Sequence, residues 1–433
     1  MVEKRIVLIG AGSIQFGLGT MADIFLSDIL KGSTIVLHDI NADALQKVKK
    51  IGEGAIKELR YDFKLETTLS REAALDGADF VISSIEVGDR FKLWEQDYEI
   101  PRKYGSRQTF GENGGPGGLF HSLRIIPPVM EICEDVMQIC PNALFINFSN
   151  PMSRICLAIK RKFPHLKFIG LCHEIFFLEK HLPTILNTPF SNLDGIKAGG
   201  LNHFGVLLEI KYKETQEDAY PDIRANALEY FEKHGREVDL IKFILKHYHV
   251  LPYTTDSHFS EYIQWGWEQI NTKDVRDFYE GYKALCKSES RRLQRFLKGR
   301  LSHKRWLKPS GERAIPIIEG IITDSGQYEL SVNIPNNEGL IEELPRDLVI
   351  EGPATVDKHG VHGVKLRKIP KGIAALWRNQ ASVQDLVVEA ALTGSKEIAL
   401  QALLADPVVD SADNAKKMLD EILKLQHEYI KLS

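Results

Sequence analysis

The first forty residues contain the pattern that most narrows the choice of fold. Residues 5–10 read Arg-Ile-Val-Leu-Ile-Gly, a short apolar run that is typical of a buried parallel strand. A glycine-rich turn and a helical stretch to about residue 30 follow, and residues 34–39 form a second apolar run. Parallel strands need a crossover between them, and such crossovers are right-handed. The pattern therefore predicts the first βαβ unit of a doubly wound parallel sheet.

The alternation of strands and helices continues along the chain. We predict that residues 1–195 form a Rossmann-like domain and that residues 196–433 form an α+β domain, as in lactate and malate dehydrogenases. In the first domain, further elements are a helix to about residue 60 and buried strands at 80–85, 143–148 and 168–172. In the second, they are strands at 196–212, helices at 222–247 and 273–299, a mixed segment at 328–370 and helices from about 383.

Charge and cysteine content exclude several classes of function. The formal net charge is −4, so we expect neither nucleic acid nor an anionic membrane as a partner. No signal peptide is expected, and no uninterrupted apolar run reaches the ~18 residues of a membrane span. The cysteines are odd in number and scattered, which argues against a disulfide framework and favours a reducing cytoplasm: Cys133, Cys140, Cys156, Cys172 and Cys286.

The turn after the first strand predicts a dinucleotide site. Glycines at this turn let the backbone approach a pyrophosphate at a helix start, where free N–H groups favour anions. Asp39, at the end of the second strand, is placed to bind a ribose diol, which favours NAD over NADP. Gln15 replaces the third glycine of the usual motif, so a tight turn without a cofactor stays open. The cofactor-binding candidates are Gly10, Gly12, Ser13, Asp39, Asn41 and Asn150.

Two polar loops suit a sugar or its neighbouring cofactor. Residues 111–118, Gly-Glu-Asn-Gly-Gly-Pro-Gly-Gly, form an unusual rigid loop that can present Glu112 and Asn113 to a polyol. Asn150, in an Asn-Pro pair at the carboxyl end of a buried strand, would face the ligand crevice. Its amide suits sugar hydroxyls or a nicotinamide ribose. The alternatives are a purely structural loop and a turn-forming Asn-Pro.

A thiol and an imidazole near strand ends predict a metal site. Cys172-His173-Glu174 follows one strand, and Asn202-His203 lies near another. Cys172 and His203 can hold a borderline divalent ion and leave positions open for substrate oxygens. Two ligands are too few for a closed structural zinc site. Taken singly, either residue can also be a buried side chain without a ligand.

A third cluster lies at residues 256–262, where several ionisable groups follow one another. Trp265 and Trp267 come close behind, and aromatic rings near polar groups suit the faces of sugars. A solvated loop is the alternative interpretation of this segment.

These motifs, in this order, resemble glycoside hydrolase family 4. The resemblance rests on Gly-Ala-Gly-Ser, Gly-Pro-Gly-Gly, Asn-Pro-Met, Gly-Leu-Cys-His and Leu-Asn-His, and it covers essentially the whole chain, including Asn-Ile-Pro-Asn at residues 333–336. It implies a dehydrogenase-type lobe fused to a second lobe, in a homodimer or homotetramer. It also implies NAD and Mn²⁺ or another divalent metal as cofactors, because this family does not use a pair of carboxylates.

The resemblance implies a redox route to hydrolysis. NAD⁺ takes a hydride from sugar C3, the ketone acidifies C2, a base removes the C2 proton, and the aglycone leaves C1. Water then adds and the hydride returns, so no net NADH accumulates. By position, Cys172 and His203 would bind the metal. The catalytic candidates are His258, Tyr262 and His173, and the choice of C2 base between the first two stays open.

The substrate is predicted from the residues around the metal cysteine. Cys-His-Glu followed by an aliphatic residue most resembles the α-galacturonidase group, so we expect hydrolysis of α-galacturonides or other hexuronides. Their carboxylate needs a cation, for which Arg90, Arg107 and Arg124 are candidates. The remaining substrate-binding candidates are Glu112, Asn113, Asn150 and Asn202.

Other activities stay open. Residues 111–118 depart from the acidic-Thr pattern of galacturonidases, so α-glucuronidase, α-galactosidase and α-glucosidase are alternatives within the family. From other classes, a hydroxy-acid or polyol dehydrogenase would accumulate NADH. An inactive NAD-binding sensor would tolerate loss of Cys172 and His203.

Overall fold

The structure, a computed structural model, describes residues 3–13 and 16–433. Six of its strands run parallel in the order β3-β2-β1-β4-β5-β6, which confirms the predicted doubly wound α/β fold. These strands are β1 (Arg5–Ile9), β2 (Thr34–His38), β3 (Lys64–Thr68), β4 (Phe80–Ser83), β5 (Leu144–Asn147) and β6 (Phe168–Gly170).

Helices connect the parallel strands, and local sequence explains where they begin and end. The second helix starts where Asn41 Oδ1 accepts the N–H of Ala44 at 3.0 Å, and it stops at Arg60, whose φ of +55° is left-handed. The helices of this half are α1 (Phe16–Leu26), α2 (Ala42–Leu59), α3 (Arg71–Leu75), α4 (Arg90–Lys103), α5 (Gly115–Ile139), α6 (Met152–Lys162) and α7 (Phe176–Ile185), with a short 3₁₀ turn η1 (Phe190–Asn192).

The second half mixes antiparallel strands with helices. Its strands are β7 (Leu193–Leu201), β8 (Phe204–Tyr212), β9 (Leu251–Pro252), β10 (Gln327–Pro335), β11 (Val349–Asp357) and β12 (Gly360–Gly363). Its helices are α8 (Tyr220–His234), α9 (Asp239–Tyr248), α10 (Asp256–Phe259), α11 (Thr272–Leu297), α12 (Ala314–Thr323), α13 (Lys371–Thr393), α14 (Lys396–Ala405) and α15 (Ala412–Leu425), and its 3₁₀ turns are η2 (Ser260–Tyr262), η3 (Gly266–Gln269) and η4 (His303–Arg305).

One sheet runs through both halves of the described chain. The antiparallel strands continue from β6 in the order β10-β11-β7-β8-β9, with β12 beside β11. The junction is narrow, because Asn333 of β10 pairs with Gly170 of β6. A single hydrophobic cluster also extends from the interior of β1 to that of β11. The division of the chain at residue 195 stays a prediction, and the sheet crosses it.

Three elements differ from the sequence-based expectation. The edge strand β3 was not expected, because Lys-Leu-Glu-Thr-Thr lacks the apolar run of its neighbours. The helix expected at 222–247 is two helices, α8 and α9, separated around Gly235. The last helices begin at residue 371, earlier than the expected 383, since α13 starts directly after Pro370.

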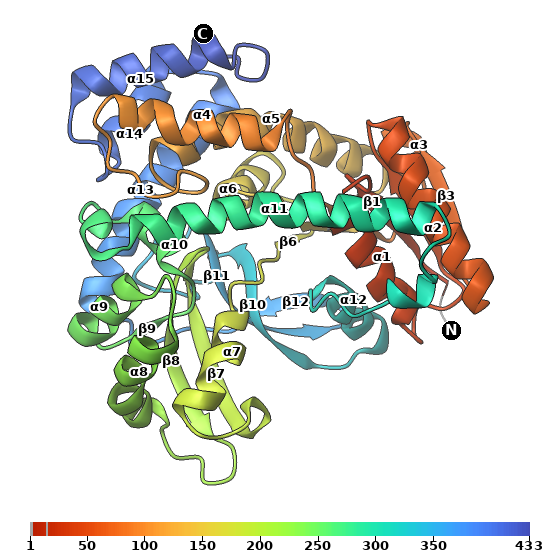
Figure 1. Ribbon diagram of the computed structural model, residues 1–433, viewed down its shortest axis with the longest axis horizontal. Helices are drawn as coiled ribbons and strands as arrows, with labels where there is room; N and C mark the ends of the chain where they lie inside the picture. Colours follow the sequence, from red (N-terminus) through yellow and green to blue (C-terminus); the bar gives the residue numbers. More distant parts are fainter. Residues whose placement is uncertain (1–2, 14–15) are drawn as a thin grey trace.

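The long helix α11 ties the second half to the first. It lies across the front of the molecule, from the region of α10 to α2 (Figure 1). Near its start, Val275 and Tyr279 pack with Trp94 and Phe110 in a separate hydrophobic cluster. None of the helices in residues 3–13 and 16–433 is both long and apolar enough to cross a membrane.

Candidate active site

The carboxyl ends of the parallel strands line a cavity of about 630 Å³. Open α/β sheets bind their ligands at this edge, and the volume suits a cofactor. Among the lining residues are Gly10 after β1, Asp39 after β2 and Asn150 after β5, all of them predicted cofactor residues, together with Ser13.

Glycine is required at the turn beside this cavity. Gly10 has φ of +81°, and a Cβ there would lie 2.1 Å from the carbonyl oxygen of Ser84. At Gly12 a Cβ would lie 2.7 Å from Asp39 Oδ2. Only glycine therefore lets the turn pack this closely on Ser84 and Asp39, the tight turn that dinucleotide motifs require.

The missing third glycine has a substitute two residues later. Gln15, which occupies the usual position, lies outside the described residues. A Cβ at Gly17 would lie only 2.2 Å from the carbonyl oxygen of Ala11, so α1 packs directly on the turn. Close packing of helix and strand is the role of the third glycine in dinucleotide motifs. A glycine two positions beyond the motif was the available signal for this residue.

Asp39 holds the turn as well as facing the cavity. Its Oδ2 accepts the N–H of Gly12 at 2.7 Å, and its Oδ1 accepts the N–H of Asn41 at 2.8 Å. Asn41 in turn caps α2, so the structure places it in a structural position beside the cavity rather than on its wall.

Cys172 and His203 lie together, as the metal prediction required. Cys172 Sγ is 3.1 Å from His203 Nε2. Cys172 follows β6, and His203 lies in the tight turn between β7 and β8 with φ of +60°. Burial raises the pKa of the Cys172 thiol well above its ordinary value, and the carboxylates of Glu351 and Glu174 add to this. Burial lowers the pKa of His203 well below its ordinary value, which favours the neutral imidazole that binds metals.

Two more potential ligands surround this pair. Ligand atoms of Glu174, His203 and His258 all lie within 4.8 Å of one another. The rings of His203 and His258 are 4.5 Å apart between centroids. Burial opposes ionisation of Glu174, yet the imidazoles of His258, His203 and His173 outweigh it and lower the pKa of this carboxyl to about 2. The cluster therefore offers a thiol, two imidazoles and a carboxylate.

A buried carboxylate positions Asn202 beside the metal pair. Glu351, which is 0% exposed, accepts Asn202 Nδ2 at 3.0 Å and the hydroxyl of Tyr253 at 2.9 Å. Asn333 Nδ2 approaches the same carboxylate at 3.4 Å. Sequence analysis missed Glu351, although a lone acid within the apolar strand Val349-Ile-Glu-Gly is a visible signal.

The glycine-rich loop is held from the second half of the chain. Glu261 Oε2 accepts the backbone N–H groups of Glu112, Asn113 and Gly114 at 2.8, 2.8 and 2.9 Å. Burial raises the pKa of Glu261 to about 7. Both polar atoms of the Asn113 side chain are buried without a protein partner in the described chain, which leaves them available to a ligand.

Two of the three arginines proposed for a uronate carboxylate form ion pairs, and the third stacks on an aromatic ring. Arg90 Nη2 donates to Glu112 Oε1 at 2.7 Å. Arg124 forms a buried pair with Asp97, at 2.5 Å between Nη2 and Oδ2. The Arg107 guanidinium stacks on the Trp267 ring, 4.5 Å from its centroid. Arg124 therefore lies in a structural ion pair and not on a free surface of the site.

His173 and Tyr262 occupy different surroundings from His258. The His173 side chain is 66% exposed and lies between two carboxylates, with Nδ1 3.6 Å from Glu312 and Nε2 3.9 Å from Glu174. The Tyr262 hydroxyl donates to the carbonyl of Asn202 at 3.4 Å, and burial together with Glu261 raises its pKa well above the ordinary value. Of the three catalytic candidates, His258 is the one whose ring packs against His203.

The residues fit the implied cofactors. Cys172 Sγ and His203 Nε2, 3.1 Å apart, are close enough that both would bind one divalent ion. His203 Nδ1 and Asn150 Oδ1 are buried without a protein partner in the described chain. The cavity beside the glycine turn is lined by Gly10, Ser13 and Asp39.

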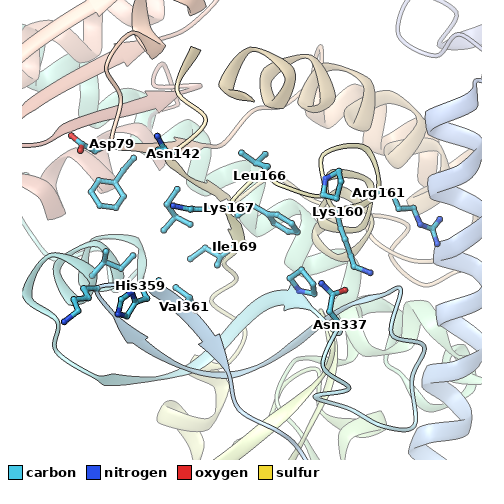
Figure 2. A pocket seen from close by; sticks show the side chains of 18 of the residues that line it. Asp79, Asn142, Lys160, Arg161, Leu166, Lys167, Ile169, Asn337, His359 and Val361 are labelled. Carbon is cyan, nitrogen blue, oxygen red and sulfur yellow. The ribbon is translucent and has the colours of Figure 1, made fainter. Parts of the chain in front are cut away.

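A larger cavity, of about 760 Å³, lies at the opposite edge of the sheet (Figure 2). Its walls include Phe80, Leu144 and Phe168, the first residues of β4, β5 and β6. Ligands of open α/β sheets bind at the carboxyl ends, so we locate the reaction at the other edge.

Fold and site together define a class of protein, a dehydrogenase-like α/β chain with a metal-capable cysteine–histidine pair at its ligand edge. Residues 5–188 match the family 4 glycosyl hydrolase model, and residues 198–409 match the model of the family 4 glycosyl hydrolase C-terminal domain. The chain belongs to family 4 of the glycosyl hydrolases and is a glycosidase, as its motifs predicted.

Relatives with different names resemble this chain. An α-glucosidase of Erwinia rhapontici is 44% identical over 99% of both chains. An α-galactosidase of Bacillus subtilis is 30% identical over 93% of both. An α-galacturonidase of Thermoanaerobacterium saccharolyticum is 29% identical over 99% of this chain and 97% of its own. The predicted preference for galacturonides is therefore not established by these similarities.

Solved structures share the fold. A 6-phospho-alpha-glucosidase from gut microorganisms, in complex with NAD and Mn²⁺, has a TM-score of 0.84 at 21% identity, covering 100% of both chains. A malate dehydrogenase from Plasmodium falciparum has a TM-score of 0.51 at 13% identity, covering 92% of this chain and 99% of its own. The second likeness confirms the dehydrogenase-like fold.

Proposed function

We propose that this protein hydrolyses α-linked glucosides with the help of NAD and a divalent ion such as Mn²⁺. The observation that carries the proposal is the Cys172–His203 pair at the same sheet edge as the cofactor-sized cavity. The Erwinia α-glucosidase, 44% identical, supports the substrate class. The NAD and Mn²⁺ bound to the 6-phospho-alpha-glucosidase support the cofactors.

Each cofactor would meet a defined set of side chains. NAD supplies a hydride acceptor and donor, and the metal ion supplies a Lewis acid beside the sugar carbonyl. Asp39 and the turn at Gly10 would hold the dinucleotide. Asn113 and Asn150 would orient the sugar, because each carries a buried polar atom without a protein partner in the described chain.

We assign proton transfer at sugar C2 to His258. Its ring packs on that of His203, whereas the Tyr262 hydroxyl is bonded to a backbone carbonyl. In D₂O, wild-type product should carry deuterium at C2. His258→Gln should release almost no sugar, because the aglycone cannot leave without loss of the C2 proton, and Tyr262→Phe should still release sugar with deuterium at C2, as measured by NMR; the reverse pattern would assign the base to Tyr262.

A neutral sugar suits this site better than a uronic acid. A carboxylate on the substrate needs an uncommitted cation. Arg90 and Arg124 are ion-paired with Glu112 and Asp97, whereas the exposed Arg107 stacks on Trp267. This supports a glucoside over a hexuronide.

α-Galacturonide hydrolysis is the second candidate. It is favoured by the Cys-His-Glu motif and by the 29% identical α-galacturonidase. The Arg90 side chain is 35% exposed, so exchange of its ion pair from Glu112 to a substrate carboxylate would supply the cation.

Release of nitrophenol from aryl glycosides tests the proposal. The α-glucoside, α-galacturonide, α-glucuronide and α-galactoside would each be offered with NAD⁺, Mn²⁺ and a thiol reductant, with and without a chelator. We expect α-glucoside cleavage that requires both cofactors and accumulates no NADH. Faster cleavage of the galacturonide would make α-galacturonides the preferred substrate. Net NADH formation without cleavage would identify a dehydrogenase instead of a glycosidase.

We also propose a homodimer or homotetramer that works in a reducing cytoplasm. The family resemblance supports the oligomer, and the free thiol of Cys172 supports the compartment, because a metal-binding thiol must stay reduced. Light scattering on the purified protein would give the oligomer size.

A further inference from the structure

An exposed aromatic side chain contacts His258, the histidine that packs on His203. Phe278, on α11, is 39% exposed, although it belongs to the same helix as the buried Val275 and Tyr279. These two residues anchor α11 through contacts with Trp94 and Phe110. The exposure of Phe278 is therefore a property of a well-anchored helix.

Phe278 is the outermost ring in a series that leads to the metal pair. Its ring centroid lies 5.8 Å from that of His258 and 5.7 Å from that of Phe110. His258 and Phe110 are only 6% and 3% exposed, and His258 packs at 4.5 Å on His203. Phe278 is thus the exposed end of a packed series of rings that begins at His203.

The tryptophans expected to face a sugar do not take this position. Trp265 packs on Phe243, with ring centroids 5.2 Å apart, and Trp267 is covered by Arg107. Phe278 contacts His258 directly, and it comes from an element that sequence analysis had not connected with the site.

We propose that Phe278 forms the platform for the leaving group of the substrate, a neutral pyranose whose apolar face packs on the ring. This rests on the proposed function. The reacting sugar would lie between the metal ion and NAD. The group attached to its C1 is therefore the part that extends towards solvent. Aromatic rings provide apolar contact area at low entropic cost, which suits the C–H face of a sugar.

The test compares a substrate that reaches the ring with one that does not. An α-linked glucose disaccharide has a full sugar as leaving group, whereas α-glucosyl fluoride has a single atom. We expect Phe278→Ala to raise KM for the disaccharide about tenfold, the loss typical of one aromatic contact, with little change for the fluoride. Phe278→Trp should restore the disaccharide KM.

Leu285→Ala is the matched control. Leu285 is 48% exposed on the same helix and lines a different cavity, together with Leu18 of α1. Leu285→Ala should leave KM unchanged for both the disaccharide and the fluoride. The fluoride reaction and the melting temperature also report whether each variant is folded.

An equal rise in KM for both substrates in Phe278→Ala, or no rise for either, would show that Phe278 is not the platform. The glucosidase function would still stand. If the wild-type enzyme cleaves neither substrate with both cofactors present, the proposed function fails and the platform with it. A KM change confined to the disaccharide, reversed by Phe278→Trp, would establish the proposal.

Discussion

His203 reaches Cys172 from a backbone conformation that few residues adopt. Its φ of +60° is left-handed and lies in the turn that joins β7 to β8. Neighbouring contacts hold this turn in place, since the adjacent Asn202 is bonded to Glu351 and to Ser153. Strain of this kind persists where the surroundings impose it, and it is concentrated at functional sites. The two-residue hairpin loop accounts for the left-handed φ, and the contacts of Asn202 fix the direction in which the imidazole leaves the loop.

Replacing Cys172 by serine should release the metal. A hydroxyl is a far weaker ligand than a thiolate, so we expect Mn²⁺ affinity to fall at least about tenfold and kcat/KM by about a hundredfold or more. Mass spectrometry of metal retained after gel filtration measures the first effect directly. Cys140→Ser, at the far end of α5, is the control and should retain wild-type metal content. Equal metal in Cys172→Ser and wild type would remove Cys172 from the ligand set.

Among the elements, α1 is distinguished by two glycines with opposite surroundings. A Cβ at Gly17 would meet the Ala11 carbonyl at 2.2 Å. At Gly19 the nearest atom, Ser310 Cβ, is 3.6 Å away, which is an ordinary contact. The helix thus needs glycine where it meets the cofactor turn and tolerates a side chain one half-turn later.

Gly17→Ala should therefore destabilise the protein by about 1–3 kcal/mol and weaken NAD⁺ binding, because the clash displaces the turn. Gly19→Ala should be neutral or stabilising by up to about 1 kcal/mol, since alanine favours helices. Urea unfolding and calorimetric titration with NAD⁺ measure the two effects. A Gly17→Ala protein with wild-type affinity for NAD⁺ would show that α1 does not position the cofactor turn.

Asp256 makes the start of α9 sensitive to pH. Its carboxylate accepts the N–H groups of Leu240 and Ile241 at 3.1 and 3.2 Å, while burial raises its pKa from 3.8 to about 7. Between pH 4 and 7, Asp256 is ionised in the unfolded chain and protonated in the folded one. Stability is thus lost as pH rises from about 4 to 7, and the loss is complete above 7.

Asp256→Asn should abolish this part of the pH dependence. Relative to the variant, the wild type should lose about 2–4 kcal/mol of unfolding free energy between pH 4 and 8. Urea titrations of both proteins across this range measure the difference. Parallel stability curves would mean that Asp256 does not change its proton affinity on folding.

How far the sequence predicts each element depends on where its partners lie. β1, β2, β4 and β5 are buried apolar runs, so they were found, whereas the polar edge strand β3 was not. Cys172 and Asn150 were predictable because parallel strands bring their carboxyl ends to one edge.

The remaining site residues come from tertiary packing. Glu351 meets Asn202 across 149 residues of sequence, and no local pattern encodes that pairing. Phe278 reaches His258 because α11 crosses the molecule, and Glu261 holds a loop that precedes it by about 150 residues. Such contacts follow from the assembled fold alone.

At the scale of the whole molecule, stability depends on the join between the parallel and antiparallel strands. A Cβ at Gly170 would lie 2.5 Å from Met152 Sδ, 2.7 Å from Cys156 Sγ and 3.0 Å from Asn333 Cβ. Glycine is therefore needed where β10 approaches β6, two residues before Cys172.

Gly170→Ala should lower the unfolding free energy by about 1–3 kcal/mol, since the crowded junction must open to admit the methyl group. Gly281→Ala is the control, because nothing lies within 4 Å of its added Cβ. Differential scanning calorimetry compares the two. An unchanged melting temperature in Gly170→Ala would show that the junction relaxes at no cost.

The same junction has a consequence for biosynthesis. Gly170 and the Asn333 that pairs with it are 163 residues apart. At roughly 5–20 residues per second, a ribosome needs about 8–30 s to make the intervening chain. During that time β6 is complete but its outer side is an unpaired strand edge, the kind of surface on which nascent chains aggregate. Newly made protein should therefore depend on chaperones most during this interval, and slower translation between residues 170 and 333 should lower the yield of folded enzyme.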